Sequence, residues 1–136
     1  SFMSTIALDV VTPNGSVFHE EDAEIVILQT KQGELGVMAG HIPTVTPLKV
    51  GVLRVKINGK FEYLAVTEGF AEIRPEQITV LVQASEFSKD IDSERAEAAK
   101  ERAENLLRQT QDERVDRYRA ELALQRAVNR LEVSKY

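Results

Sequence analysis

The stretch EFSKDIDSERA, residues 86–96, marks the point where the sequence changes from strand-forming to helix-forming residues. Before it, short apolar runs and alternating patterns are bounded by Gly, Pro and Asn, which is typical of β-strands. After Asp90 the sequence contains no Gly or Pro, and most residues are good helix formers. The stretch therefore divides the chain into a β half and a helical half.

The β half contains seven candidate strands: residues 5–12, 15–18, 24–30, 52–57, 61–66, 69–73 and 77–83. Turn residues recur at intervals of roughly 8 to 12 residues, which indicates a sandwich or barrel. Asn58-Gly59 lies between two alternating runs and predicts a tight hairpin, because both residues tolerate positive φ. Pro75 predicts another turn. The glycine-rich segment 33–41, GELGVMAGH, is interpreted as a tight β corner, since no helix follows it to bind phosphate.

The helical half predicts two helices, from Ile91 to Gln109 and from Arg114 to Glu132, separated by a break at residues 110–113. We expect Ser88 or Asp90 to cap the first helix. A short break implies an antiparallel hairpin. The expected fold is α+β, with a β-sandwich domain at 3–86 and a helical hairpin at 87–136. The apolar stripes are small, so the hairpin should be only marginally stable: Ala96, Ala99, Ala103, Leu106 and Leu107 on one helix, and Ala120, Ala123, Leu124, Ala127, Val128 and Leu131 on the other.

Composition excludes several functional classes. The 136 residues are 43% apolar, enough for a real core, and the net charge of -5 argues against nonspecific nucleic-acid binding. The absence of Cys excludes disulfides and zinc-thiolate clusters. Apolar runs are too short for a membrane helix, no secretion signal is expected, and there is no P-loop motif or nucleophile motif. We therefore expect a non-catalytic cytoplasmic protein that binds proteins or small molecules.

Arginines on the two predicted helices are the main candidates for binding. If the hairpin turns near residues 111 and 112, facing positions sum to about 223, which places Arg95 level with position 128, between Arg126 and Arg130. Arg102 extends the same face. Like charges four residues apart repel unless they are neutralised, and arginine matches phosphate geometry. The alternative is a solvated face on which glutamates such as Glu97 offset the arginines locally.

Three segments, GELGVMAGHIPTVTPL (33–48), DIDSERAEAAKERAE (90–104) and RAELALQRAVNRL (119–131), strongly resemble the epsilon subunit of bacterial F-type ATP synthases. The similarity covers essentially residues 3–133. The resemblance implies a non-catalytic central-stalk subunit of a proton-transporting complex, peripheral on the cytoplasmic face of the membrane. It implies as partners the gamma subunit, the c-ring and the catalytic beta and alpha subunits, with no nucleic acid and no membrane insertion. It also implies that the C-terminal helices can restrain ATP hydrolysis.

The resemblance further implies residues for two sites. Glu34 and His41 match the family loop that faces the c-ring and gamma, so both are candidate partner contacts. Some family members bind ATP through a signature that stands here as Ile91-Asp92-Ser93-Glu94-Arg95-Ala96. By the same likeness four more residues complete this site: Glu86, Arg102, Arg126 and Arg130. ATP would be a regulatory ligand that is not hydrolysed, and no metal is required.

These residues lead to a two-state hypothesis. With ATP bound the hairpin stays folded; without it the helices extend towards the catalytic subunits, where Arg114, Arg117 and Arg119 would meet acidic surface. One rival is a purely structural coupling subunit that does not bind ATP. Another is a freestanding nucleotide-binding sensor or enzyme that ignores gamma.

Overall fold

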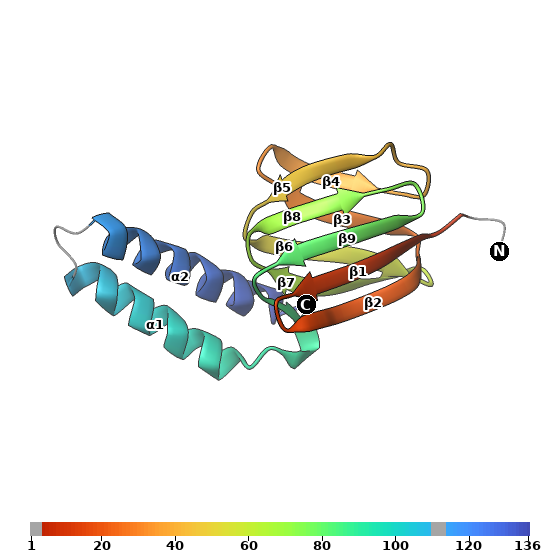
Figure 1. The fold of residues 1–136 in the computed structure, drawn as a ribbon. Coiled ribbons are helices and arrows are strands. Elements are labelled where there is room, and N and C mark those ends of the chain that lie inside the picture. The colour runs from red at the N-terminus through yellow and green to blue at the C-terminus, as the bar shows by residue number, and fades with distance from the viewer. Residues whose placement is uncertain (1–3, 110–113) are drawn as a thin grey trace. The chain divides into compact units, whose positions relative to one another are not determined.

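The computed structural model of the chain describes residues 4–109 and 114–136. It divides into two compact units, Ser1–Phe87 and Ser88–Tyr136, and each is described by itself (Figure 1). The first unit consists of β-strands, and the second contains two antiparallel α-helices. The expected fold class, a β-sandwich followed by a helical hairpin, is confirmed.

The first unit is a sheet of ten strands that folds over itself. Its strands pair in the order β10-β7-β6-β3-β5-β8-β9-β1-β2, and β4 pairs with β3. All pairs are antiparallel except β1 with β9. The strands are β1 (Ile6–Thr12), β2 (Gly15–Ala23), β3 (Ile25–Thr30), β4 (Gly33–Val37), β5 (Thr44–Leu48), β6 (Gly51–Ile57), β7 (Lys60–Val66), β8 (Gly69–Ile73), β9 (Gln77–Val82) and β10 (Ser85–Phe87).

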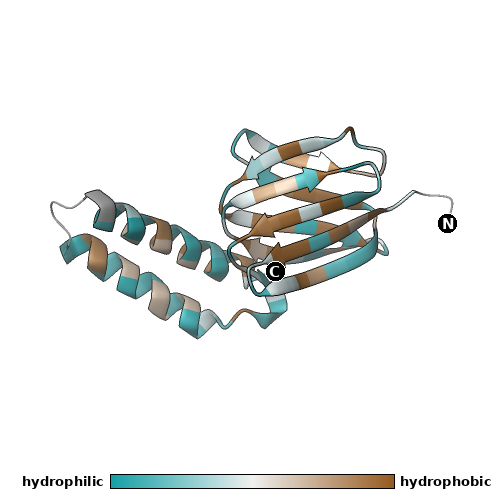
Figure 2. Cartoon of the chain, viewed as in Figure 1, coloured by the Kyte–Doolittle hydropathy of each residue, from teal (hydrophilic) through white to brown (hydrophobic). Residues whose placement is uncertain are grey.

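A single apolar core lies inside this unit. Phe18 on β2 stacks on Phe87 on β10 with ring centroids 6.4 Å apart, so the two ends of the strand order meet. Figure 2 shows the apolar residues concentrated on the strands, where they alternate with polar ones. Alternation places one side of each strand in the core and the other in solvent. The largest fully buried side chains are Ile6, Leu8, Leu28, Leu48, Leu53, Leu64, Ile73 and Ile78.

Three strands were not expected from the sequence. The segment interpreted as a tight corner instead forms β4, which pairs with β3 from Val26↔Val37 to Thr30↔Gly33. Strand β5 contains Pro47, which cannot donate to a sheet, and it meets β3 only at Thr30↔Leu48 while pairing along its length with β8. Strand β10 is only three residues long. Short or glycine-rich strands carry too little pattern to be recognised alone.

Two glycines have clear structural roles. The predicted hairpin at Asn58-Gly59 is confirmed: both residues have positive φ, 50° and 78°, between β6 and β7. The Gly59 amide donates to Glu24 Oε1 at 3.2 Å, which links this turn to the residue directly before β3. At Gly69 a side chain would clash with the backbone of Leu81 and Val82 on β9, so close packing of β8 on β9 requires glycine.

The second unit begins with a 3-10 helix, Ser88–Asp90, followed by α1 (Ser93–Gln109) and α2 (Arg114–Val133). The expected cap at Ser88 or Asp90 is wrong. Asp92 caps α1, because its Oδ1 accepts the backbone N–H groups of Glu94 and Arg95 at 3.1 and 3.2 Å. The predicted helix start at Ile91 therefore lies two residues too early. The predicted break at 110–113 lies outside the described residues.

Most of the fully buried side chains described on α1 and α2 are alanines. The buried alanines of α1 are Ala96 and Ala103, and those of α2 are Ala120 and Ala127. Each pair is seven residues apart, as expected for a narrow seam between two helices. Leu106 and Ala123, which were expected in the apolar stripes, are exposed. The seam is therefore narrower than the sequence suggested.

Candidate functional site

The buried alanines of the two antiparallel helices have matching spacings. Ala96 and Ala127 have residue numbers that sum to 223, and so do Ala103 and Ala120, which is the sum expected for facing positions from a turn near residues 111 and 112. This is the register used to place Arg95 between Arg126 and Arg130. The alanine pattern therefore supports the same alignment of the arginines from an independent set of side chains.

The start of α1 holds four of the predicted ATP-site residues. Asp92 lies at the cap, where its Oδ1 is engaged by two backbone amides and its carbonyl oxygen accepts the N–H of Ala96 at 3.0 Å. Ile91 and Ala96 are buried, whereas the Arg95 side chain is exposed. A carboxylate at a helix N-terminus is stabilised by the helix dipole. The Asp92 side chain thus has a structural role whether or not it also contacts a ligand.

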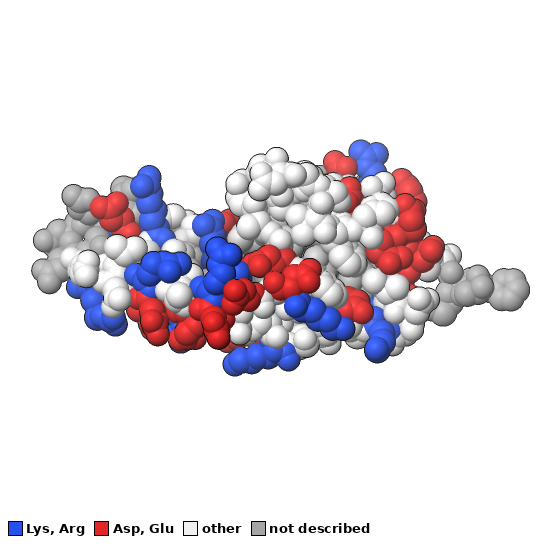
Figure 3. Space-filling view, turned by 90° about the horizontal axis from the view of Figure 1, so that it is seen from below, with Lys and Arg blue, Asp and Glu red and all other residues white. Residues whose placement is uncertain are grey.

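The arginines of the predicted site differ in exposure. Arg95 and Arg102 on α1 are exposed, and Arg126 and Arg130 on α2 are half-buried. The Nε atom of Arg126 is buried. Figure 3 shows Lys and Arg side chains interleaved with Asp and Glu over the helices. A rigid, half-buried guanidinium loses less side-chain entropy on binding an anion than an exposed one does.

Local charge pairing, the alternative interpretation of the arginines, is seen on α2 at Arg117. Arg117 Nε lies 3.3 Å from Glu121 Oε1, four residues away on the same helix. Both side chains are half exposed, so this pair contributes little to stability. Arg117 was expected to meet acidic surface in the extended form, and here it is paired within its own helix.

Glu86 belongs to the first unit, whereas the other predicted ATP-site residues belong to the second. It lies on β10, opposite Ala65 of β7, and its side chain is half-buried. Its position is therefore set by the β-sheet. The two helices position the arginines.

Glu34, one of the two predicted partner contacts, is held in place by neighbouring strands. Its Oε2 accepts Gln29 Nε2 of β3 at 3.1 Å and lies 2.8 Å from Arg54 Nη2 of β6. The Nε atom of Arg54 is buried and has no hydrogen-bond partner within the described residues. Sequence reasoning missed Gln29 and Arg54, because their proximity to Glu34 depends on the register of three strands.

His41, the other predicted contact, lies in the loop between β4 and β5. Its Nδ1 lies 2.7 Å from the carbonyl oxygen of Ile42, and its backbone N–H donates to Met38. The same loop is attached to the β8–β9 turn by the Gly40 N–H, which donates to the Pro75 carbonyl at 2.8 Å. A pocket of about 390 Å³, lined by residues 43–45 and 72–76, lies beside it.

A row of apolar side chains on the outer face of the sheet was also missed. Pro47, Phe70 and Leu81 are direct cross-strand partners on β5, β8 and β9, and Val11 of β1 continues the row. Phe70 is 55% exposed and Leu81 49% exposed. Exposed apolar patches mark interaction sites when their members are contiguous. The sequence did contain a signal for this row: Phe70 and Leu81 are apolar, although the alternating pattern of their strands assigns both positions to solvent.

The comparisons with known proteins match both units. The family model described as "ATP synthase, Delta/Epsilon chain, beta-sandwich domain" matches residues 5–88. The model described as "ATP synthase, Delta/Epsilon chain, long alpha-helix domain" matches residues 89–135. The chain is therefore of the two-domain class formed by the delta and epsilon chains of ATP synthases.

Relatives narrow this class further. The ATP synthase epsilon chain of Macrococcus caseolyticus is 56% identical over 135 residues, with 98% of this chain and 99% of that one covered. The epsilon chain of Staphylococcus aureus strain JH9 is 50% identical, with 98% of each covered. This chain belongs to the ATP synthase epsilon chain family, a family of non-catalytic subunits.

Solved structures share the fold. A chain of the Euglena gracilis mitochondrial ATP synthase, determined with OSCP, F1 and the c-ring, has a TM-score of 0.79 at 25% identity, covering 97% of this chain and 82% of that one. A chain of the Tetrahymena thermophila enzyme has a TM-score of 0.68 at 12% identity, covering 98% of this chain and 99% of that one. Within residues 4–109 and 114–136, neither helix has the length and apolar character needed to span a membrane.

Proposed function

We propose that the chain is a central-stalk subunit that couples rotation in an F-type ATP synthase and restrains ATP hydrolysis through its helical hairpin. Its partners are the gamma subunit, the c-ring and the catalytic beta and alpha subunits. It acts as a peripheral subunit on the cytoplasmic face of the membrane. Membership in the epsilon chain family supports the coupling role.

The β-sandwich offers two surfaces for these partners. The apolar row formed by Pro47, Phe70, Leu81 and Val11 provides contiguous apolar area of the kind that protein interfaces bury. Glu34, fixed by Gln29 and Arg54, offers an oriented carboxylate. A carboxylate that is already held loses little freedom on binding, which favours a specific contact.

The helical hairpin is the nucleotide-responsive element in this proposal. ATP binds the folded hairpin and is not hydrolysed, with Arg95, Arg102, Arg126 and Arg130 near the phosphates and Glu86 and Asp92 near the nucleoside. The observation that supports this proposal is the burial of Ala96, Ala103, Ala120 and Ala127, whose spacing agrees with the helix alignment expected from the position of the turn. A polyphosphate offers several oxygens, and their geometry matches the donors of arginine side chains.

A weak seam makes the response to ATP possible. Alanine side chains bury little apolar area, so the folded hairpin has only a small advantage over an extended form. A ligand that binds only the folded form stabilises it by about 2.7 kcal/mol at a hundredfold excess over Kd. A shift of this size can change which form predominates.

Isothermal titration calorimetry of ATP into the full chain tests the site. We expect saturable binding to the unmodified protein and at least tenfold weaker binding to Arg126→Ala, about 1.4 kcal/mol or more, because a charge-assisted contact is removed. Arg117→Ala is the matched control, since Arg117 pairs with Glu121 on the same helix. Absence of binding heat in the unmodified protein would favour the purely structural subunit.

A further inference from the structure

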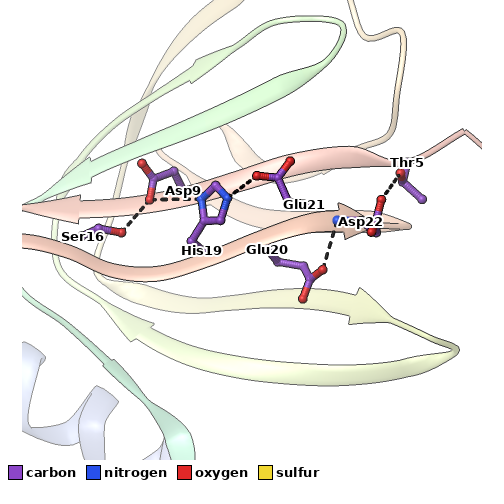
Figure 4. A network of polar contacts seen from close by, with 7 residues as sticks. All are labelled: Thr5, Asp9, Ser16, His19, Glu20, Glu21 and Asp22. Atoms are coloured by element: carbon purple, nitrogen blue, oxygen red, sulfur yellow. Dashed lines mark hydrogen bonds and ion pairs between the residues drawn. The ribbon is translucent and has the colours of Figure 1, made fainter.

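The strand β2 carries a cluster of ionisable side chains that the proposed function does not use. His19 on β2 is the direct cross-strand partner of Asp9 on β1. Its Nε2 lies 2.6 Å from Glu21 Oε1, and its Nδ1 lies 3.7 Å from Asp9 Oδ1. Ser16 donates a hydrogen bond to the same Asp9 oxygen at 2.7 Å (Figure 4). Both ring nitrogens of His19 therefore face carboxylates.

The position of this cluster in the sheet is specific. Strand β2 is the last strand in the pairing order, so it is hydrogen-bonded on one side only, to β1. The β1–β2 register shifts twice, between Ile6 and Leu8 and between Val10 and Val11. The His19–Asp9 pair lies in the regular stretch between these two irregularities. The register shifts disrupt the backbone hydrogen bonds on both sides of this pair, so a side-chain contact between His19 and Asp9 stabilises the strand pairing where it is otherwise weak.

We infer that the His19 imidazole, when it is protonated, stabilises the pairing of the terminal strand β2 with β1. We call its contacts with Glu21 and Asp9 the His19 clasp. Only the imidazolium carries a proton on both ring nitrogens, so only that form can donate towards Glu21 and Asp9 together. A neutral ring places a lone pair opposite one of the two carboxylates. Loss of the proton therefore weakens one side of the clasp.

The charged surroundings of His19 agree with this inference. The hydrogen bond to Glu21 raises the pKa of His19, with a further contribution from Asp9, while desolvation opposes the rise. Strands β6 and β10, which also pack on β2, carry Arg54, Lys56 and Glu86. Within the described residues the charged groups that shift the His19 pKa are Glu21 and Asp9.

The direction of the pH response follows from linkage. Glu21 lies on β2 with His19, so Asp9 is the part of the pKa rise that comes from the neighbouring strand. Opening of β2 removes Asp9 and lets the pKa of His19 fall towards its ordinary value of 6.5, so the stability added by the clasp is complete below that value. It is lost as the pH rises through the pKa of the folded form. Strand β2 should therefore open more readily in alkaline than in mildly acidic solution.

Amide hydrogen exchange of the full chain, measured by NMR from about pH 5.5 to 8.5, tests the clasp. After correction for intrinsic rates, we expect the protection of β2 relative to the β6–β7 hairpin to fall as His19 loses its proton. The fall is tenfold for each unit by which the native pKa exceeds the pKa of the opened strand. The His19 ring signals, followed in the same samples, give the native pKa directly.

Two variants separate the clasp from a general effect of pH. His19→Gln should show β2 protection that no longer changes with pH, whereas the matched control His41→Gln should keep the change. Glu21→Gln should lower the pKa of His19. An unaltered pH response in His19→Gln, or titration of His19 at or below 6.5 in the unmodified chain, would overturn the inference.

Discussion

The side chain of Asp92 decides where the first helix begins. Ser88, Asp90 and Asp92 all precede the helix and all are capable of capping it. Only Asp92 has its Oδ1 within hydrogen-bonding distance of the second and third amides of α1 among the described contacts. The choice depends on the backbone path, since Ser88–Asp90 is already wound into a 3-10 helix.

Substitution of Asp92 separates its capping role from its proposed contact with ATP. Asp92→Asn should keep the stability of the helical unit, because asparagine is as good a cap as aspartate. Asp92→Ala should reduce that stability by about 1 kcal/mol. Loss of helical circular dichroism with increasing urea measures both. If the carboxylate also contacts the nucleoside, ATP affinity should fall in Asp92→Asn as well; equal stability of the two variants would refute the capping role.

At the scale of an element, the hairpin depends on residues that are small enough to let two helices approach. Ala103 is 2% exposed and Ala120 4% exposed, so neighbouring atoms surround each methyl group closely. Protein interiors are packed so tightly that an added methyl group forces the neighbouring side chains to move. The same narrow seam that limits the stability of the hairpin makes it sensitive to the size of each residue.

A larger side chain between the two helices should open the hairpin. Ala103→Leu should destabilise the packing of α1 on α2 by about 1–3 kcal/mol, because the larger side chain has no space between the helices. Ala123→Leu is the matched control, since Ala123 is exposed on α2. Limited proteolysis of the helical unit, with the β unit as internal reference, measures the effect. Equal cleavage rates in the two variants would contradict the seam as described.

The whole molecule combines a firmly paired unit with a weakly packed one. In the part of the chain that the structure describes, the β unit has ten strands around an apolar core, whereas the buried side chains of the two helices are mostly alanines. Weakly packed elements open at low free-energy cost and are suited to conformational change. The firm unit therefore suits permanent attachment to a partner, and the weak unit suits a response to ligand.

Attachment of the β unit should depend on the exposed apolar row. Phe70→Glu should weaken incorporation into the ATP synthase at least tenfold without unfolding the chain, because Phe70 is 55% exposed and its loss leaves the core intact. Phe61→Glu is the matched control, since Phe61 is 37% exposed on the other part of the sheet, on β7. Co-purification with the membrane-bound complex measures incorporation. Equal yields for the two variants would remove the row from the interface.

The sequence by itself determined the division into β and helical halves, the Asn58-Gly59 hairpin and the two helices, because these follow from periodicity and local backbone preference. It could not determine β4, β5 or β10, since short strands form only when a neighbouring strand satisfies their hydrogen bonds. Tertiary structure alone brought Arg54 to Glu34, joined Phe70 to Leu81 and set His19 opposite Asp9. These contacts depend on strand register across distant segments, which no local pattern encodes.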